Sequence, residues 1–334
     1  MKKAKEKGNK GALFVLLCIV VFLMSFISSL IFKMKHTPNA LKKYSVDWDD
    51  SIGSLHSDIS YGNLDSNKFD LYLPADDTKE TYGLVIYLHA GGFTEGDKSD
   101  DASMLQWLCS KGYVAAGVNY TLFSEEHPDA NVYTQSQDIK ISVPYIIDAA
   151  KELGYNIDQM AISGGSAGGC LALLYAYRDA DTSPVPVKMV FEAVGPSCFY
   201  AEDWINIGQN PNEPLSLDDS DISGIAAIFS VMSGTEITSE MITSDHYLDK
   251  MKDISAVEWI TDQSVPTVSA YGSWDRMQAF MASKRLDAAL TEHNIPHEYI
   301  VCEHSGHGLQ NDNDKYLEYM EKIEEYLNTY MPTK

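Results

Sequence analysis

The chain has 334 residues, of which 45% are hydrophobic and 22% charged, and its formal net charge is −23. This composition is typical of a globular protein and excludes a disordered or fibrous one. Residues 1–35 hold seven lysines and one glutamate, so the other 18 basic and 47 acidic residues give residues 36–334 a net charge of about −29. Because such an acidic body repels phosphate backbones, the charge also excludes nucleic acid as a partner.

The N-terminal segment contains a long uncharged run, residues 12–32. As a helix rising ~1.5 Å per residue it would be about 31 Å long, close to the ~30 Å of a bilayer core. Five lysines in residues 1–11 place the N-terminus in the cytoplasm. We therefore predict a cytoplasmic basic segment at 1–11, a single-pass transmembrane signal anchor at 12–32 in the cell membrane, and an extracytoplasmic body. The alternative is cleavage near Ile27-Ser28-Ser29 and a secreted body.

After a polar linker at 33–58, strands and helices alternate through residues 59–332. Short apolar or alternating runs predict strands, and apolar residues at helical spacing predict helices. The predicted strands are 69–73, 84–88, 113–118, 160–162, 187–191, 265–270 and 295–301, and the predicted helices are 104–108, 138–153, 168–174 and 316–331. This alternation predicts an α/β fold with a mostly parallel central sheet and helices on both faces.

Residues 197–260 interrupt the alternation between two predicted strands. The segment is long, acidic and aromatic. A stretch of this length inside a compact domain is usually a functional lid, so we predict a cap insertion here. An irregular decoration of the surface is the alternative.

The strongest motif is GGSAG at 164–168, a GxSxG pattern between a predicted strand and a predicted helix. The small flanking residues allow the sharp turn that exposes a nucleophilic serine, here Ser166. A second motif, HAGGF at 89–93, directly follows the predicted strand 84–88. Its consecutive glycines let backbone N–H groups approach a tetrahedral oxyanion closely. We therefore expect an oxyanion hole formed by the N–H groups of Gly91, Gly92 and Ala167.

At these residues the chain resembles the α/β-hydrolase family, and most closely the bacterial esterases similar to hormone-sensitive lipase and to feruloyl and acetyl esterases. Two positions depart from the family pattern: Ala90 replaces a glycine of the usual HGGG, and Thr121 stands where many relatives have arginine. These departures bear on how the loops are anchored and on acyl preference. The segments that carry the resemblance are FDLYLP (69–74), HAGGFTEGDK (89–98), VNYTL (118–122), ISGGSAGG (162–169) and HSGHG (304–308).

The family order of nucleophile, acid and histidine implies the remaining catalytic residues. Asp275 follows the predicted strand 265–270, where the acid is expected, whereas Asp262 precedes that strand. His304 and His307 compete for the role of base, and His307 matches the terminal GHG pattern of the family. We therefore predict the triad Ser166, Asp275 and His307.

Neither the histidines nor the cysteines predict a metal site. The pair His304 and His307 lacks acidic and cysteine partners at ligand spacing, and the five cysteines show no CxxC pattern. The sequence does not decide their disulfide pairing. No cofactor is required by the predicted chemistry.

The resemblance implies a serine hydrolase that cleaves carboxylic esters through an acyl-enzyme intermediate. A serine peptidase or amidase of the same fold, or a non-catalytic binding ectodomain, are the alternatives. The substrate would be a small-molecule or polysaccharide-linked ester, while the oligomeric state stays open. Because the 197–260 insertion is mostly polar, we expect short acyl chains, although its apolar run at 224–232 could instead line an acyl tunnel.

Overall fold

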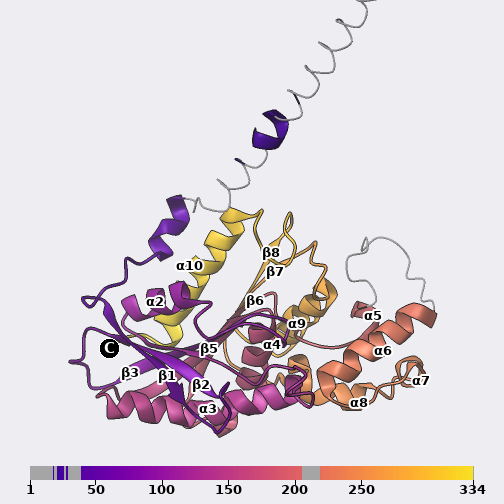
Figure 1. Cartoon of the computed structure of the whole chain (residues 1–334), viewed down its shortest axis with the longest axis horizontal. Helices are drawn as coiled ribbons and strands as arrows, with labels where there is room; N and C mark the ends of the chain where they lie inside the picture. Colours follow the sequence, from indigo (N-terminus) through magenta and orange to yellow (C-terminus); the bar gives the residue numbers. More distant parts are fainter. Residues whose placement is uncertain (1–17, 19–20, 26–27, 29–38, 205–218, 334) are drawn as a thin grey trace, which may run out of the picture. The chain divides into compact units, whose positions relative to one another are not determined.

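Eight strands form one sheet in the computed structural model, in the order β1-β2-β4-β3-β5-β6-β7-β8 (Figure 1). The structure describes residues 18, 21–25, 28, 39–204 and 219–333. The chain divides into two units, Met1–Ser45 and Val46–Lys334, and the whole sheet belongs to the second. In the first unit, a 3₁₀ helix η1 spans Asn39–Tyr44.

All seven predicted strands are present, and from β3 onward each pair of neighbours is parallel. β2 pairs antiparallel with both β1 and β4. The mostly parallel sheet predicted from the sequence is therefore confirmed. The bounds are β1 Gly53–Ser60, β2 Lys68–Pro74, β3 Tyr82–Leu88, β4 Val114–Val118, β5 Ile157–Gly165, β6 Val187–Ala193, β7 Thr267–Gly272 and β8 His297–Cys302.

Strand β1 was not predicted, and it begins inside the segment interpreted as a linker, 33–58. Most of its residues are exposed or half-buried, and its register with β2 shifts between His56 and Ile59. An edge strand needs to bury few side chains, so its sequence need not alternate between apolar and polar residues. This is why the sequence pattern did not indicate β1.

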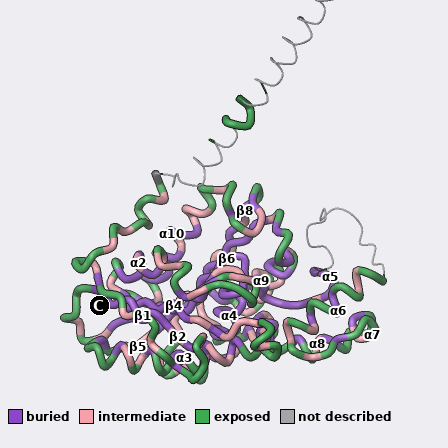
Figure 2. The backbone as a smooth tube through the Cα atoms, in the orientation of Figure 1, coloured by how far each residue is buried: buried purple, intermediate pink, exposed green. Residues whose placement is uncertain are grey.

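Helices cover both faces of the sheet. α2 (Ala102–Ser110) and α10 (Asn313–Tyr330) lie on one face, and α3 (Val132–Glu152), α4 (Ala167–Leu174) and α9 (Phe280–Glu292) on the other (Figure 1). α4 continues into η2 (Tyr175–Asp179) and η3 (Ala180–Thr182). Among the parallel strands, β3, β4 and β7 are almost wholly buried (Figure 2), as strands of a sheet covered on both faces are.

Two helices differ from the prediction. α3 begins before the predicted 138, because Asn131 caps it by accepting a hydrogen bond from the Thr134 backbone N–H while the Thr134 hydroxyl accepts one from the Asn131 N–H. α9 was not predicted. Its buried stripe is short and includes small residues, so its helical pattern is weak.

The insertion 197–260 lies between β6 and β7, and its described part, 197–204 and 219–260, is helical. Phe199, Trp204, Phe229 and Tyr247 pack together at its centre, with ring centroids 5.1 to 6.1 Å apart. These aromatic residues extend the hydrophobic core of the domain into the segment. Its elements are α5 Ala201–Trp204, α6 Asp219–Ser233, α7 Ser239–Thr243, α8 Leu248–Met251, η4 Lys252–Ile254 and η5 Ala256–Trp259.

The transmembrane prediction for residues 12–32 needs correction. Most of that segment, and all of the predicted cytoplasmic segment 1–11, lies outside the described residues. Within the part of the chain that the structure describes, no helix combines the length and apolarity needed to cross a bilayer. This finding contradicts the prediction of a transmembrane signal anchor.

Candidate active site

Ser166 lies on the sharp turn between β5 and α4. Its backbone has φ 52° and ψ −118°, a strained conformation for a residue with a side chain. A Cβ at Gly164 would come within 2.4 Å of the Gly168 carbonyl carbon, and one at Gly168 within 2.1 Å of the Leu88 carbonyl oxygen. Only glycine fits at either position, so the GxSxG spacing follows directly from the close packing of β3, β5 and α4.

The structure brings the three predicted triad residues together. Nε2 of His307 lies 2.8 Å from Oγ of Ser166, and its Nδ1 lies 2.7 Å from Oδ2 of Asp275. The Asp275 side chain is fully buried, and its Oδ1 accepts backbone N–H bonds from Met277 and Gln278 at 2.8 and 3.1 Å. The carboxylate is therefore held by its own loop in the orientation that faces the imidazole.

The two rival residues point elsewhere. Nδ1 of His304 lies 2.8 Å from Oδ1 of Asp312, and the His304 side chain is 78% exposed. This pairing raises the pKa of His304. Asp262 lies 2.7 Å from His293, and its side chain is 81% exposed. Neither residue is part of the hydrogen-bonded row that includes Ser166.

Asp312 fixes the loop that carries His307, a role that was not predicted. Its Oδ2 accepts the Ser305 hydroxyl at 2.5 Å and the His304 backbone N–H at 2.9 Å. The two bonded residues directly precede the GHG pattern that contains His307. The sequence offers little sign of this role, because an aspartate just before a helix is usually explained as a helix cap.

The loop after β3 lies beside the start of α4. Gly91 and Gly92 have φ of 125° and 59°, and a Cβ at Gly91 would come within 1.9 Å of the Glu95 carbonyl oxygen. The close approach of Gly168 to the Leu88 and His89 carbonyls joins this loop to the first turn of α4, which begins at Ala167. The backbone N–H groups predicted for the oxyanion hole thus come from two segments that are packed against each other.

His89 supports this loop as a buried, uncharged residue. Its ring stacks on Tyr120 at 4.3 Å between centroids, and its Nδ1 donates to the Ala90 carbonyl at 2.7 Å. The Tyr120 hydroxyl donates to the His89 carbonyl at 2.9 Å. Burial lowers the pKa of His89, so the ring stays neutral and acts as part of the scaffold.

Gln135, which was not predicted, anchors the loops around Thr121. Its Nε2 donates to the Phe93 carbonyl at 2.9 Å and to the Thr121 carbonyl at 3.0 Å, while Oδ2 of Asp138 accepts the Thr121 N–H at 2.8 Å. Two side chains of α3 therefore hold the loop where many relatives have arginine. A polar residue on the buried face of a helix is the one sequence feature that could have indicated this role.

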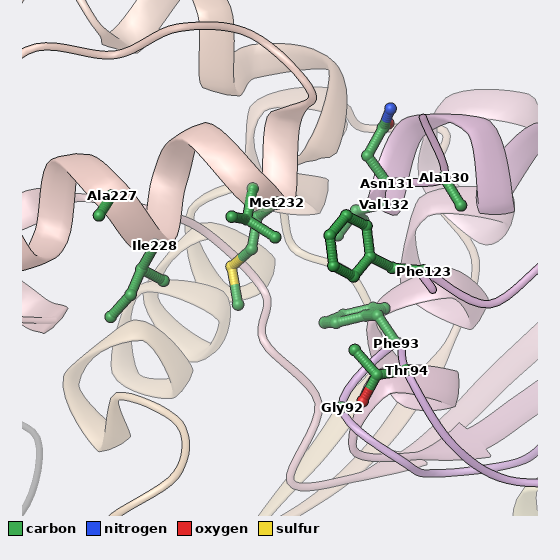
Figure 3. A pocket seen from close by; sticks show the side chains of 11 residues that line it. Gly92, Phe93, Thr94, Phe123, Ala130, Asn131, Val132, Ala227, Ile228 and Met232 are labelled. Atoms are coloured by element: carbon green, nitrogen blue, oxygen red, sulfur yellow. The ribbon is translucent and has the colours of Figure 1, made fainter. Parts of the chain in front are cut away.

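An apolar pocket of about 350 Å³ opens beside Gly92. In Figure 3 the rings of Phe93 and Phe123 lie opposite Ile228 and Met232, which come from α6 of the insertion. The apolar run 224–232 therefore forms one wall of a cavity next to the oxyanion loop. The lining residues are Gly92, Phe93, Thr94, Phe123, Ala130, Asn131, Val132, Ala227, Ile228, Val231 and Met232.

The arrangement can move a proton but offers no site for a metal among the described residues. Across residues 39–204 and 219–333, no group of three or more His, Cys, Asp or Glu side chains is placed to share a metal ion. The described cysteines are all free thiols. A serine hydroxyl, an imidazole and a buried carboxylate in one hydrogen-bonded row allow nucleophilic attack assisted by a general base.

The sheet order, the helices on both faces and the strand–turn–helix around Ser166 define an α/β-hydrolase. The family model BD-FAE matches residues 69–290, about two thirds of the chain. The chain therefore belongs to the BD-FAE family. This assignment confirms the esterase branch of the α/β-hydrolases that the sequence motifs indicated.

Known relatives are similar over part of their length. The esterase LipI of Mycobacterium tuberculosis is 27% identical over 146 residues, covering 43% of this chain and 42% of that protein. The ethyl acetate hydrolase of Pseudomonas putida is 27% identical over 151 residues, covering 42% and 46%. The chain thus spans less than half the length of the curated relatives it matches.

Among solved structures, a truncated carbohydrate esterase from gut microbiota superposes with a TM-score of 0.64 at 18% identity. The superposition covers 84% of this chain and 99% of that one. At this level of identity the match demonstrates a shared fold, and it confirms the α/β-hydrolase architecture.

Proposed function

We propose that the chain is a serine hydrolase that cleaves carboxylic esters. The observation that carries the proposal is the continuous hydrogen-bonded row Ser166–His307–Asp275. Membership of the BD-FAE family and similarity to named esterases support it. The substrate is a small-molecule or polysaccharide-linked ester.

The proposed reaction has two halves. His307 takes the hydroxyl proton through Nε2 as Oγ of Ser166 attacks the ester carbonyl, and Asp275 stabilises the imidazolium that forms. The N–H groups of Gly91, Gly92 and Ala167 bind the oxyanion. His307 then gives the proton to the leaving alcohol. Water, activated by the same imidazole, attacks the acyl-enzyme and releases the acid and the free serine hydroxyl.

The proposed catalytic domain comprises residues 59–332, with residues 197–260 as its cap. Strand β1 pairs with β2 from Gly53 onward, which supports moving the start of the domain upstream into the segment predicted as a linker. The contacts of α6 with α3 and the position of α6 in the pocket wall support a cap that borders the site.

We further propose that the pocket beside Gly92 receives the acyl chain, with short chains preferred over long ones. With a volume of about 350 Å³, the pocket lies at the small end of ligand-binding cavities. This size favours a short acyl group such as butyryl over a palmitoyl chain. The pocket lining is apolar, so each added methylene gains hydrophobic contact until the space is filled.

A panel of p-nitrophenyl esters from acetyl to palmitoyl, with acetylated xylan and a p-nitroanilide, tests the proposal. We expect hydrolysis of the esters, a maximum at short to intermediate chains, and much slower cleavage of the anilide. Turnover of palmitoyl faster than butyryl would contradict the acyl proposal alone. Efficient anilide cleavage without ester cleavage would favour a peptidase or amidase.

A further inference from the structure

Glu192 is a buried carboxyl group that the proposed reaction does not use. It lies near the carboxyl end of β6, beside Gly164 of β5, and no part of it is exposed. Its Oε2 accepts the backbone N–H of Gly195 at 2.8 Å. The hydroxyl of Tyr271 donates to the Gly195 carbonyl at 2.8 Å. The other carboxyl oxygen of Glu192, Oε1, is buried without a hydrogen-bond partner.

The turn that Glu192 holds is strained. Val194 has φ 52°, a conformation that a β-branched side chain rarely adopts. Such a conformation persists only where the surroundings over-determine it. Here the Val194 N–H bonds to the Ala270 carbonyl at 2.9 Å, and both backbone groups of Gly195 are held by Glu192 and Tyr271.

The strained turn touches the nucleophile on two sides. The carbonyl of Ala193 accepts the backbone N–H of Ser166 at 2.8 Å. A Cβ at Gly195 would come within 2.7 Å of the Gly169 carbonyl carbon and 2.8 Å of the Cys170 nitrogen, so the turn packs directly on the first turns of α4. The same helix starts at Ala167, a proposed oxyanion donor. A shift of the turn would therefore displace Ser166 and α4.

We propose that Glu192 is a positioning residue whose carboxyl holds the Gly195 N–H, clamps the Ala193–Gly195 turn and thereby fixes Ser166 and the oxyanion-binding start of α4. This inference rests on the proposed function, because it assigns Glu192 a role in the same nucleophilic step. It assigns no contact between Glu192 and the substrate.

The surroundings of Glu192 keep its carboxyl neutral near pH 7. Burial raises its pKa to about 8. The titratable groups that face it are phenols and one thiol, whose own pKa values are raised by burial, so no charge on them compensates an ionised carboxylate. They are Tyr87 of β3, Cys170 of α4, Tyr177 of η2, Tyr271 of β7, Tyr299 of β8 and Tyr319 of α10.

Because the carboxyl is neutral near pH 7, an uncharged amide of the same shape is a suitable conservative replacement for it.

The test compares Glu192→Gln with Glu192→Ala, using kcat and KM for p-nitrophenyl butyrate at neutral pH. Glutamine can accept from the Gly195 N–H through its amide oxygen, so kcat should stay near wild type. Alanine should lower kcat roughly 10²-fold with little change in KM, since small displacements of reacting groups have that effect.

Two outcomes would overturn the proposal. One is a folded Glu192→Ala protein with wild-type kcat. The other, which decides even if the alanine variant does not fold, is a folded Glu192→Gln protein whose kcat falls roughly 10²-fold. If the wild type hydrolyses no ester, the proposed function fails instead. The role of Glu192 is then tested by comparing the rates at which a fluorophosphonate labels Ser166 in the wild type and in the two Glu192 variants, which needs no ester substrate.

Discussion

The triad and the pocket wall are held by two different kinds of structure. Ser166, Asp275 and His307 follow β5, β7 and β8 directly, and backbone bonds or glycine contacts fix each loop at the edge of the sheet. The pocket wall comes from α6, a helix of the insertion, where Ile228 and Val231 remain 44% and 53% exposed. Close packing around the triad loops tolerates few substitutions, whereas the partly exposed wall of α6 can accept larger side chains.

Because of this difference, we expect the triad to determine the rate of the chemical step and the pocket wall to determine which esters are preferred. Removal of a triad group should abolish turnover for every ester alike, because the group acts on the reacting atoms. A change in the pocket wall should redistribute activity among esters and leave the chemical step intact. Variants in the two regions should therefore differ in how activity changes across the ester panel, as well as in the size of the loss.

The largest effect is expected for Ser166→Ala. Ester hydrolysis should fall by roughly 10⁴-fold or more for every acyl chain, because the nucleophile is lost and the triad acts as a unit. Initial rates on the ester panel measure this loss, with thermal unfolding as the control for folding. A loss confined to some chain lengths would mean that Ser166 contributes to selection and is not the nucleophile.

His307→Ala should be about as severe as Ser166→Ala, whereas the matched variant His304→Ala should be mild. His307 is hydrogen-bonded to Ser166, while His304 pairs with Asp312 at the surface. Comparing kcat of the two alanine variants at neutral pH separates them. The reverse ranking would move the role of base to His304.

Asp275→Asn should lower kcat by roughly 10⁴-fold, with KM nearly unchanged. The amide can donate toward Nδ1 of His307 and so favours the wrong tautomer of the imidazole. Asp262→Asn is the matched control, since Asp262 pairs with His293 away from the site. Equal kcat for these two variants would contradict the assignment of the acid.

The smallest effect, and the one that tests the pocket, is expected for Ile228→Trp. The larger side chain fills the cavity, so the octanoyl-to-acetyl ratio of kcat/KM should fall by ~10-fold or more while acetyl hydrolysis persists. Ile141→Trp is the matched control, because Ile141 is also an exposed helical isoleucine, 50% accessible, and is not part of the pocket lining.

A parallel series that varies the alcohol at a fixed acetyl group completes this comparison. Ile228→Trp should leave that series unchanged. If the alcohol series shifts and the acyl series does not, the pocket receives the alcohol and the acyl proposal is wrong.

The two regions also differ in how far the sequence predicts them. Ser166 and the glycines around it are constrained by local geometry, so the GGSAG motif between a predicted strand and a predicted helix was enough to locate the turn. Asp275 was chosen by its place after a predicted strand and the order of the family, and His307 also by the GHG pattern. The loop supports Gln135 and Asp312 were missed, because their roles depend on which carbonyls and hydroxyls tertiary packing brings near them.

The prediction of an insertion at 197–260 rested on the length and composition of the segment, which do not indicate how its helices pack. Whether the run 224–232 packs or lines a cavity depends on where α6 lies against Phe93 and Phe123, and helical periodicity contains no such information. Strand β1 was missed for a related reason, since an edge strand with little burial leaves a weak pattern. The spanning helix was predicted from an uncharged run and its flanking lysines, and that prediction is contradicted, since no helix among the described residues could cross a bilayer.

Peptide mapping after reaction with a fluorophosphonate tests the central claim most directly. The wild type should acquire one adduct, on the peptide that contains Ser166, and ester hydrolysis should fall in proportion to labelling; Ser166→Ala should acquire none. An adduct on another residue, or ester hydrolysis that survives complete labelling of Ser166, would contradict the account.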